Sequence, residues 1–127
     1  MKANRRSLLL LSTLFCSTAI SQSNIYEFKY LNEKYENKNH KSKGNYAISI
    51  RPAEATIYWD QSDLSERADF DLINQRDTVI NKRSYIMFTG KSQAFKDYYI
   101  DIFYPVSNNI KELHIIDKEV NTHYIFN

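Results

Sequence analysis

Through most of the chain, hydrophobic and polar residues alternate with a period of two, the pattern of half-buried strands. In the first such stretch Tyr26, Phe28 and Tyr30 alternate with Glu27 and Lys29. Further strand-like stretches follow at 46–50, 56–59, 78–80, 83–88, 98–104, 113–115 and 122–126. Strands at this spacing, separated by polar turns, predict an antiparallel meander or curved sheet of about six to eight short strands.

The segment 33–44 interrupts this pattern because it is polar, has no apolar period and ends in Gly44. Its basic residues, which suggest a basic patch, are Lys34, Lys38, Lys41 and Lys43. Glu33 and Glu36 lie among them, which favours an exposed loop or a frayed hairpin tip.

The segment 62–75 departs from the period of two in another way. Asp63 and Glu66 have the spacing of a capping box. Apolar residues then recur about every four positions, at Leu64, Ala68 and Leu72, with Ile73 beside them. We therefore expect one short amphipathic helix over 62–75, which makes the fold class mainly β (α+β). A calcium loop is the alternative for so many carboxylates, but it needs a glycine that this segment lacks.

The beginning of the chain has the composition of a secretory signal peptide. Three basic residues in the first six positions precede an uncharged run over 7–20, and the small residues Ala19 and Ser21 stand where a signal peptidase cleaves. We expect cleavage after Ser21, with residues 22–127 forming a single exported β-rich domain in the periplasm, in the outer envelope or outside the cell. The alternative, an uncleaved anchor, needs about 20 apolar residues, more than this run has.

The chain contains one cysteine, Cys16, inside the predicted signal peptide. A lipid-anchored cysteine would follow a small residue, whereas Phe15 precedes this one, so we expect no lipidation. Without a second cysteine there is no internal disulfide, and the cleaved chain has neither a thiolate nucleophile nor a cysteine zinc site.

Cleavage also changes the charge. The full chain has a net charge of +2, but residues 1–21 contain three basic residues and no acidic one. The remaining chain has 14 basic and 15 acidic residues, a net charge of −1. Because phosphate binding requires a basic face on the folded domain, we expect no nucleic-acid partner. No transmembrane span is expected after cleavage.

Residues with catalytic or metal-binding chemistry are few. Of the three histidines, His40 lies in the polar segment and His114 and His123 lie on separate predicted strands. Two histidines on neighbouring strands could bind a metal, but without further ligands ordinary exposed histidines are the simpler interpretation. The chain has no nucleophile elbow, phosphate-binding loop or zinc-protease motif. We therefore predict no catalytic residues, no metal and no cofactor, and a protein that is not an enzyme.

The aromatic content is the unusual feature: 10 Tyr, 7 Phe and 1 Trp among 127 residues. These side chains can be ordinary core and cross-strand pairs, or they can line an apolar pocket. If they line a pocket, its walls should include the aromatic residues of the most apolar strands: Tyr85, Phe88, Tyr98 and Phe103.

The order of the elements resembles a family. A signal peptide precedes Ile25-Tyr26-Glu27-Phe28-Lys29-Tyr30, a polar insertion, Tyr46-Ala47-Ile48-Ser49-Ile50, then Ile57-Tyr58-Trp59 and an acidic helix. Over residues 22–76 this order is similar to the N-terminal part of the GLPGLI family, small exported proteins of Gram-negative bacteria without an assigned function. The motif Gly-Leu-Pro-Gly-Leu-Ile is absent, so the resemblance implies a domain truncated at its C-terminus.

Together these features predict an exported, non-enzymatic envelope protein with a binding or structural role. Its partner would be an envelope protein or an apolar small ligand. The alternative is a periplasmic carrier of a hydrophobic small molecule or lipid.

Overall fold

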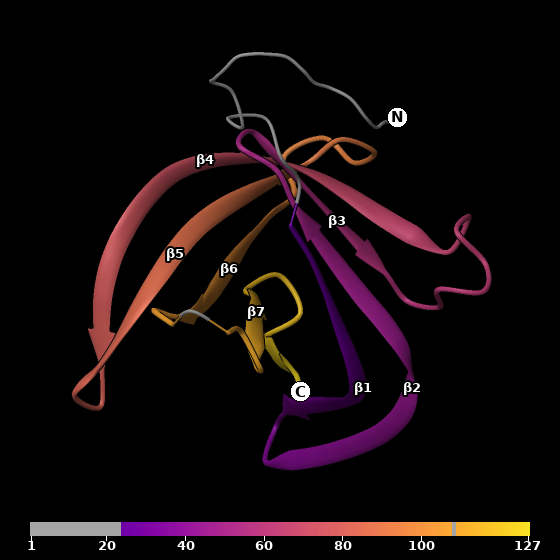
Figure 1. Ribbon diagram of the computed structural model, residues 1–127, viewed down its shortest axis with the longest axis horizontal. Coiled ribbons are helices and arrows are strands. Elements are labelled where there is room, and N and C mark those ends of the chain that lie inside the picture. The colour runs from indigo at the N-terminus through magenta and orange to yellow at the C-terminus, as the bar shows by residue number, and fades with distance from the viewer. Residues whose placement is uncertain (1–23, 108) are drawn as a thin grey trace.

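The computed structural model describes residues 24–107 and 109–127. The predicted signal peptide, residues 1–21, with Cys16 lies outside the described residues. Eight strands follow one another: β1 (Asn24–Tyr35), β2 (Lys38–Ile50), β3 (Glu54–Tyr58), β4 (Arg67–Ile80), β5 (Arg83–Ser92), β6 (Tyr99–Pro105), β7 (Leu113–Asp117) and β8 (Thr122–Phe126). Each strand pairs with the next, and β8 pairs with β1, so the meander closes into a barrel around a common interior (Figure 1).

The prediction of a mainly β antiparallel meander is confirmed, but its open sheet and its helix are wrong. The described residues contain no helix, and β4 occupies most of the segment that was expected to be helical. Ala68, Phe70 and Leu72 pack in or against the core on one face of β4, and Arg67 and Asp69 lie on the other. This stretch therefore has a period of two, and the four-residue spacing of Ala68 and Leu72 is equally compatible with a strand.

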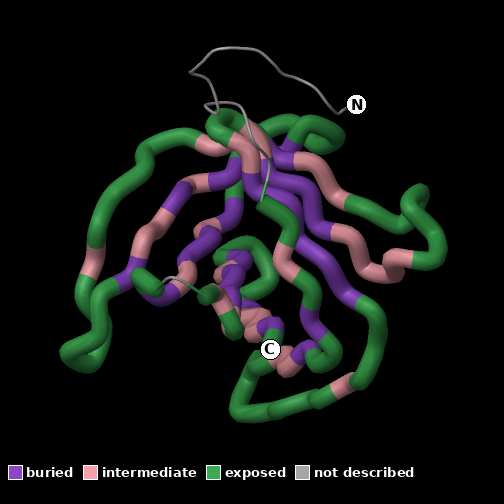
Figure 2. Tube along the Cα trace, in the orientation of Figure 1, coloured by how far each residue is buried: buried purple, intermediate pink, exposed green. Residues whose placement is uncertain are grey.

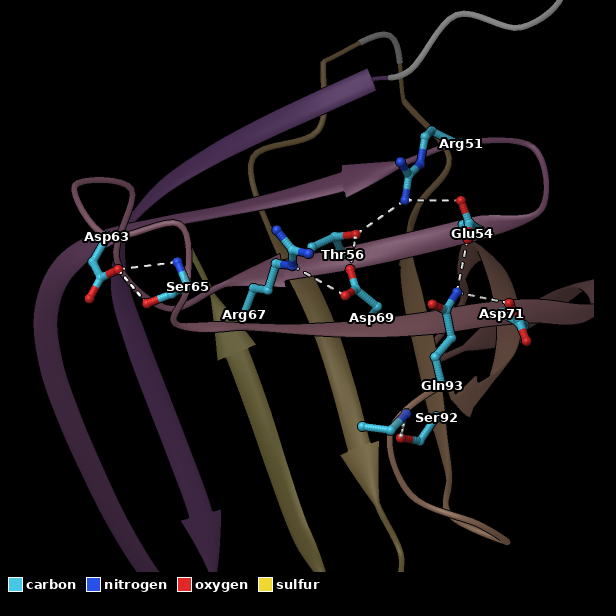
Figure 3. Close-up of polar contacts among 11 residues, drawn as sticks. Arg51, Glu54, Thr56, Asp63, Ser65, Arg67, Asp69, Asp71, Ser92 and Gln93 are labelled. Atoms are coloured by element: carbon cyan, nitrogen blue, oxygen red, sulfur yellow. Dashed lines mark hydrogen bonds and ion pairs between the residues drawn. The ribbon is translucent and has the colours of Figure 1, made fainter.

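The acidic residues before β4 form turns instead of a helix cap. The Asp60 carboxylate accepts hydrogen bonds from the backbone N–H and the hydroxyl of Ser62. The Asp63 carboxylate accepts the same two bonds from Ser65 (Figure 3). Such Asx turns give the backbone an alternative to a helical first turn. They let the connection from β3 reverse and start a strand at Arg67.

Closure depends on the length and the bend of β1. Its first half pairs with the end of β2, from Asn24 opposite Ile50, and its second half also pairs with β8, from Leu31 opposite Phe126. Between the halves the register shifts at 28/30, and the backbone N–H groups of Lys29 and Tyr30 donate to the Asn127 carbonyl. A bulge of this kind bends a strand, which brings β1 round to β8 and removes both sheet edges.

The barrel interior is filled by hydrophobic side chains. Phe126 is fully buried, and its ring lies 5.7–6.1 Å from the rings of Phe28, Tyr46 and Trp59. Burial follows the middle of the strands, whereas the hairpin tips are exposed (Figure 2). The buried core residues are Phe28, Leu31, Tyr46, Ile48, Ile50, Ala55, Ile57, Phe70, Ile100, Ile102, Leu113, Ile115 and Phe126.

The β1–β2 and β7–β8 connections lie next to each other at one end of the barrel. The predicted loop at 33–44 is a long exposed hairpin at this end (Figure 1), with Glu36 and Asn37 at its turn and both at positive φ. Two consecutive residues with positive φ form a turn whose twist matches that of paired strands. Within the described part of the chain, no helix is long and apolar enough to cross a membrane.

Candidate functional site

The four aromatic residues proposed as pocket walls lie on two sides of the barrel wall. Tyr85 and Phe88 are three positions apart on β5, so their side chains point to opposite faces. Phe88 lies 6.3 Å from the Tyr104 ring, and Tyr98 packs against the core beside Phe70. Tyr85 and Phe103 contact each other on the outer face, with ring centroids 5.5 Å apart. Phe88 and Tyr98 therefore lie on the inner side of the barrel wall, and Tyr85 and Phe103 lie on the outer side. The four side chains do not line one cavity.

Tyr98 has a polar partner inside the barrel. Its hydroxyl donates a hydrogen bond to the carboxylate of Asp117, which is almost fully buried on β7. Burial and this hydrogen bond raise the pKa of Tyr98. The other Asp117 oxygen accepts from the Glu119 backbone N–H. Because both oxygens have donors, Asp117 connects the residue before β6 with the β7–β8 turn and is satisfied within the protein.

The structure brings together His114 and His123, which the sequence placed on neighbouring strands. Nδ1 of His114 lies 2.9 Å from Nε2 of His123, across β7 and β8. They are not the ordinary exposed histidines that we expected, because His114 is only 9% exposed and His123 is half-buried. The ring of Phe103 stacks on His114 with centroids 4.7 Å apart, and this aromatic cover explains the burial. His40 lies far along the exposed hairpin, opposite Glu33.

Two further residues extend the histidine pair into a row. Glu112 Oε2 lies 2.7 Å from Nε2 of His114, and Glu112 Oε1 accepts a hydrogen bond of 2.8 Å from Arg83. We call Arg83, Glu112, His114 and His123 the histidine row. No sequence motif pointed to Glu112, although its position two residues before His114 places both side chains on one face of an extended chain.

The carboxylate determines the direction of the hydrogen bonds in this row. An ionised carboxylate only accepts, so Nε2 of His114 must carry a proton and donate it to Glu112. When His114 is neutral, its Nδ1 is then an acceptor, and Nε2 of His123 donates to it. This arrangement leaves Nδ1 of His123 as the remaining ring nitrogen, and in the neutral row it is an acceptor.

The charges in and around the row shift its titration. Burial lowers the pKa of His123, and the nearby His114 and Lys34 lower it further because they disfavour a second positive charge. Burial alone would raise the pKa of Glu112, but its hydrogen bonds to His114 and Arg83 and their charges outweigh this and lower it. The row therefore keeps Glu112 ionised and disfavours the charged form of His123.

The row is not arranged as a metal centre. Among the described residues, no group of three or more histidine, cysteine, aspartate or glutamate side chains is placed to hold a metal ion. In the row, the nitrogens of His114 are both engaged in hydrogen bonds. Hydrogen bonds join its four side chains.

His123 also lines a hollow on the outer wall of the barrel. The hollow has a volume of about 610 Å³ and lies between the β1–β2 hairpin and β7–β8. We call it the hairpin groove, and its lining residues are Lys34, Tyr35, Glu36, Asn37, Lys38, Asn39, Ile116, Asn121, Thr122 and His123. It is mostly polar, with two lysines, one carboxylate and three asparagines, and His123 joins it to the histidine row.

Comparison of the chain with protein-family models, with curated proteins and with solved structures gives no significant match. The interpretation of the groove therefore depends on its own geometry.

Proposed function

We propose that this chain is an exported, non-enzymatic binding protein of the bacterial envelope that contacts its ligand at the outer wall of the barrel. The observation that supports this most strongly is the hairpin groove, a hollow of about 610 Å³ lined by residues of four strands and two turns, most of them polar. In ligand sites, convergent polar groups fix the orientation of the ligand and provide specificity. The core residues, in contrast, pack against one another inside the barrel.

The arrangement of the histidine row supports binding more than catalysis. A histidine base that activates a nucleophile must lie within hydrogen-bond reach of it. Within the described residues, the hydrogen bonds of His114 lead to Glu112 and His123, and none joins either histidine to a serine or threonine. The row therefore lacks the nucleophile that acyl-transfer chemistry requires.

One experiment tests whether the protein is exported. The full chain, expressed in a Gram-negative host, is recovered from the envelope fraction and its N-terminus is sequenced. We expect the mature protein to begin at Gln22. A mature protein that begins at Met1, or that stays in the cytoplasm, would contradict the proposal.

The second candidate is a carrier of a hydrophobic small molecule or lipid. It is favoured by the number of strands, because an eight-stranded barrel encloses an interior that side chains just fill or that holds one small ligand. Interior aromatics such as Phe88 would then contact the ligand. Displacement of an apolar fluorescent probe tests this, with Phe88→Ala compared with Tyr85→Ala on the outer face. Selective loss of probe binding in Phe88→Ala supports the carrier, and equal binding by both variants contradicts it.

A further inference from the structure

We propose that the hairpin groove binds an oxyanion, such as a phosphate group, through Lys34, Asn39 and His123, and that binding takes up a proton at the histidine row. This inference rests on the proposed binding role and specifies its ligand. It can fail while export and the binding role stand, since the measurements are independent of the location of the protein.

The positions of the cationic side chains converge on the groove. Lys34 on β1 stands directly opposite His123 on β8 and opposite Asn39 on β2, so three polar residues lie side by side across three strands. Directly opposed residues point to the same face of a sheet. Lys38 also borders the groove, but it stands opposite Tyr35, so its side chain leaves the strand on the other face. The groove thus presents donors from both of its walls.

The positive charge of the groove is not neutralised by its own residues. Glu36 is the one carboxylate among the lining residues, against two lysines. Among the ion pairs of the described residues, none involves Lys34 or Lys38. Ammonium groups without an acidic partner, next to amide donors, are the groups that recognise phosphate as point charges.

The turns that border the groove hold its walls in place. Glu36 and Asn37 have φ values of 47° and 63°, and Asn121 in the β7–β8 turn has φ 51°. Tight turns with such left-handed residues keep the flanking strands in register. Because the strands also belong to the closed barrel, the site exists before a ligand arrives, which lowers the entropy cost of binding.

The histidine row determines how His123 responds to protons. In the neutral row, Nδ1 of His123 is an acceptor and repels an oxyanion. One added proton turns Nδ1 of His123 from an acceptor into a donor, whichever of the two histidine rings carries the charge. If His123 becomes imidazolium, its Nδ1 is protonated; if His114 becomes imidazolium, its Nδ1 donates to Nε2 of His123, which then must carry its own proton on Nδ1. In both cases the free nitrogen becomes a donor.

The groups that surround His123 make this proton uptake depend on a ligand. His114 faces it from β7 and Lys34 from β1, and both oppose a further positive charge, whereas Phe103 from β6 is uncharged. Glu112 lies beyond His114 and favours a charge on the row. A bound oxyanion offsets the repulsion from Lys34, so it raises the pKa of His123. By linkage, protonation tightens oxyanion binding by the same factor.

The test uses the exported domain, residues 22–127, and inorganic sulfate, whose charge is constant between pH 5.5 and 8. Sulfate is titrated calorimetrically at both pH values, and backbone amide shifts are followed by NMR. We expect about tenfold tighter binding at pH 5.5, which corresponds to a pKa change of about one unit. We also expect shifts at 34–39 and 121–123, and net proton uptake in buffers of different ionisation enthalpy.

Three variants separate the groove from general charge. Lys34→Gln should weaken binding at both pH values, His123→Gln should remove most of the pH dependence, and Lys96→Gln, an exposed lysine outside the groove, should change neither. Circular dichroism verifies that each variant is folded. Equal loss in Lys34→Gln and Lys96→Gln, or binding that is as tight at pH 8 as at pH 5.5, would overturn the proposal.

A second measurement identifies the source of the oxyanion. Sedimentation with phosphatidylglycerol vesicles is compared with phosphatidylcholine vesicles and with inorganic phosphate in solution. Binding to the anionic vesicles that Lys34→Gln abolishes indicates a lipid headgroup, and binding of phosphate without vesicle binding indicates a soluble ligand. Binding of none of the anions refutes the site.

Discussion

The outer face of the β3–β4 hairpin and the tip of the β1–β2 hairpin are both exposed and both carry charged residues. The two surfaces differ in whether these charged residues pair with one another. On β3–β4 the charged groups form a connected network (Figure 3). Arg51 donates to Thr56, and Thr56 donates to Asp69, which also pairs with Arg67. At the tip of the β1–β2 hairpin, Lys34 lines the hairpin groove and makes no ion pair within the described residues.

A second bridge completes the network on β3–β4. The Gln93 amide donates to Glu54 and to Asp71, so the connection after β5 is bound to the strands beside it (Figure 3). Arg51 also pairs with Glu54 at 3.2 Å. Acids and bases that satisfy one another in this way hold strands in register and leave little charge for a ligand. The comparison teaches that the function of a charged surface depends on whether its charges are neutralised internally.

We expect the largest loss of stability from substitutions in the core, where the two hairpins should behave alike. Phe70 on β4 and Phe28 on β1 are both buried in the core. Truncation of either to alanine removes packing and leaves a cavity, so each should lower the free energy of unfolding by about 3–5 kcal/mol. Denaturant unfolding measures this, and Phe95→Ala, at a ring that is 68% exposed, is the control. A loss below about 0.5 kcal/mol at Phe28 would place β1 outside the core.

We expect an intermediate loss of stability from a substitution on the outer face of β3–β4, and almost none at the tip of β1–β2. Asp69→Ala leaves the buried Thr56 hydroxyl without its acceptor, so we expect a loss of about 1–3 kcal/mol. Asp69→Asn keeps an acceptor and should lose less. Lys34→Ala removes a side chain that makes no ion pair within the described residues, and it should change stability by less than about 0.5 kcal/mol. Similar losses at Asp69 and Lys34 would erase the distinction between the two surfaces.

The smallest effect concerns pH. The pKa of His123 is lower in the folded protein than in the unfolded chain, so the unfolded chain takes up a proton first as the pH falls. The free energy of unfolding should therefore decrease as the pH falls through the ordinary histidine range near about 6.5, and level off once the folded His123 is protonated. Urea unfolding between pH 8 and 5 measures the slope, which should be smaller in His123→Gln.

Two outcomes would contradict this sign. Stability that increases as the pH falls through the histidine range would mean that the folded protein favours the charged His123. An unchanged slope in His123→Gln would assign the pH dependence to other groups. The contribution of Glu112 is separate, because its pKa is lowered and its stabilisation is lost only at more acidic pH.

Local patterns predicted most of the strands. The alternation in 26–30, 46–50 and 98–104 corresponds to β1, β2 and β6, because one buried face requires a period of two. The same local analysis was wrong at 62–75, where the spacing of Ala68 and Leu72 suits a helix and a strand equally. Phe70, an apolar residue midway between Ala68 and Leu72, indicates a period of two and therefore a strand.

Local periodicity accounts for most of the strands and for the order of a meander, since these depend on neighbouring residues. The return of β8 to β1 does not follow from local periodicity, because closure depends on a bulge in β1 and on pairs far apart in the chain. The same closure brings Lys34 opposite His123, and the pairing of β6, β7 and β8 stacks Phe103 on His114. The candidate site therefore arises from contacts between distant segments, which no local pattern encodes.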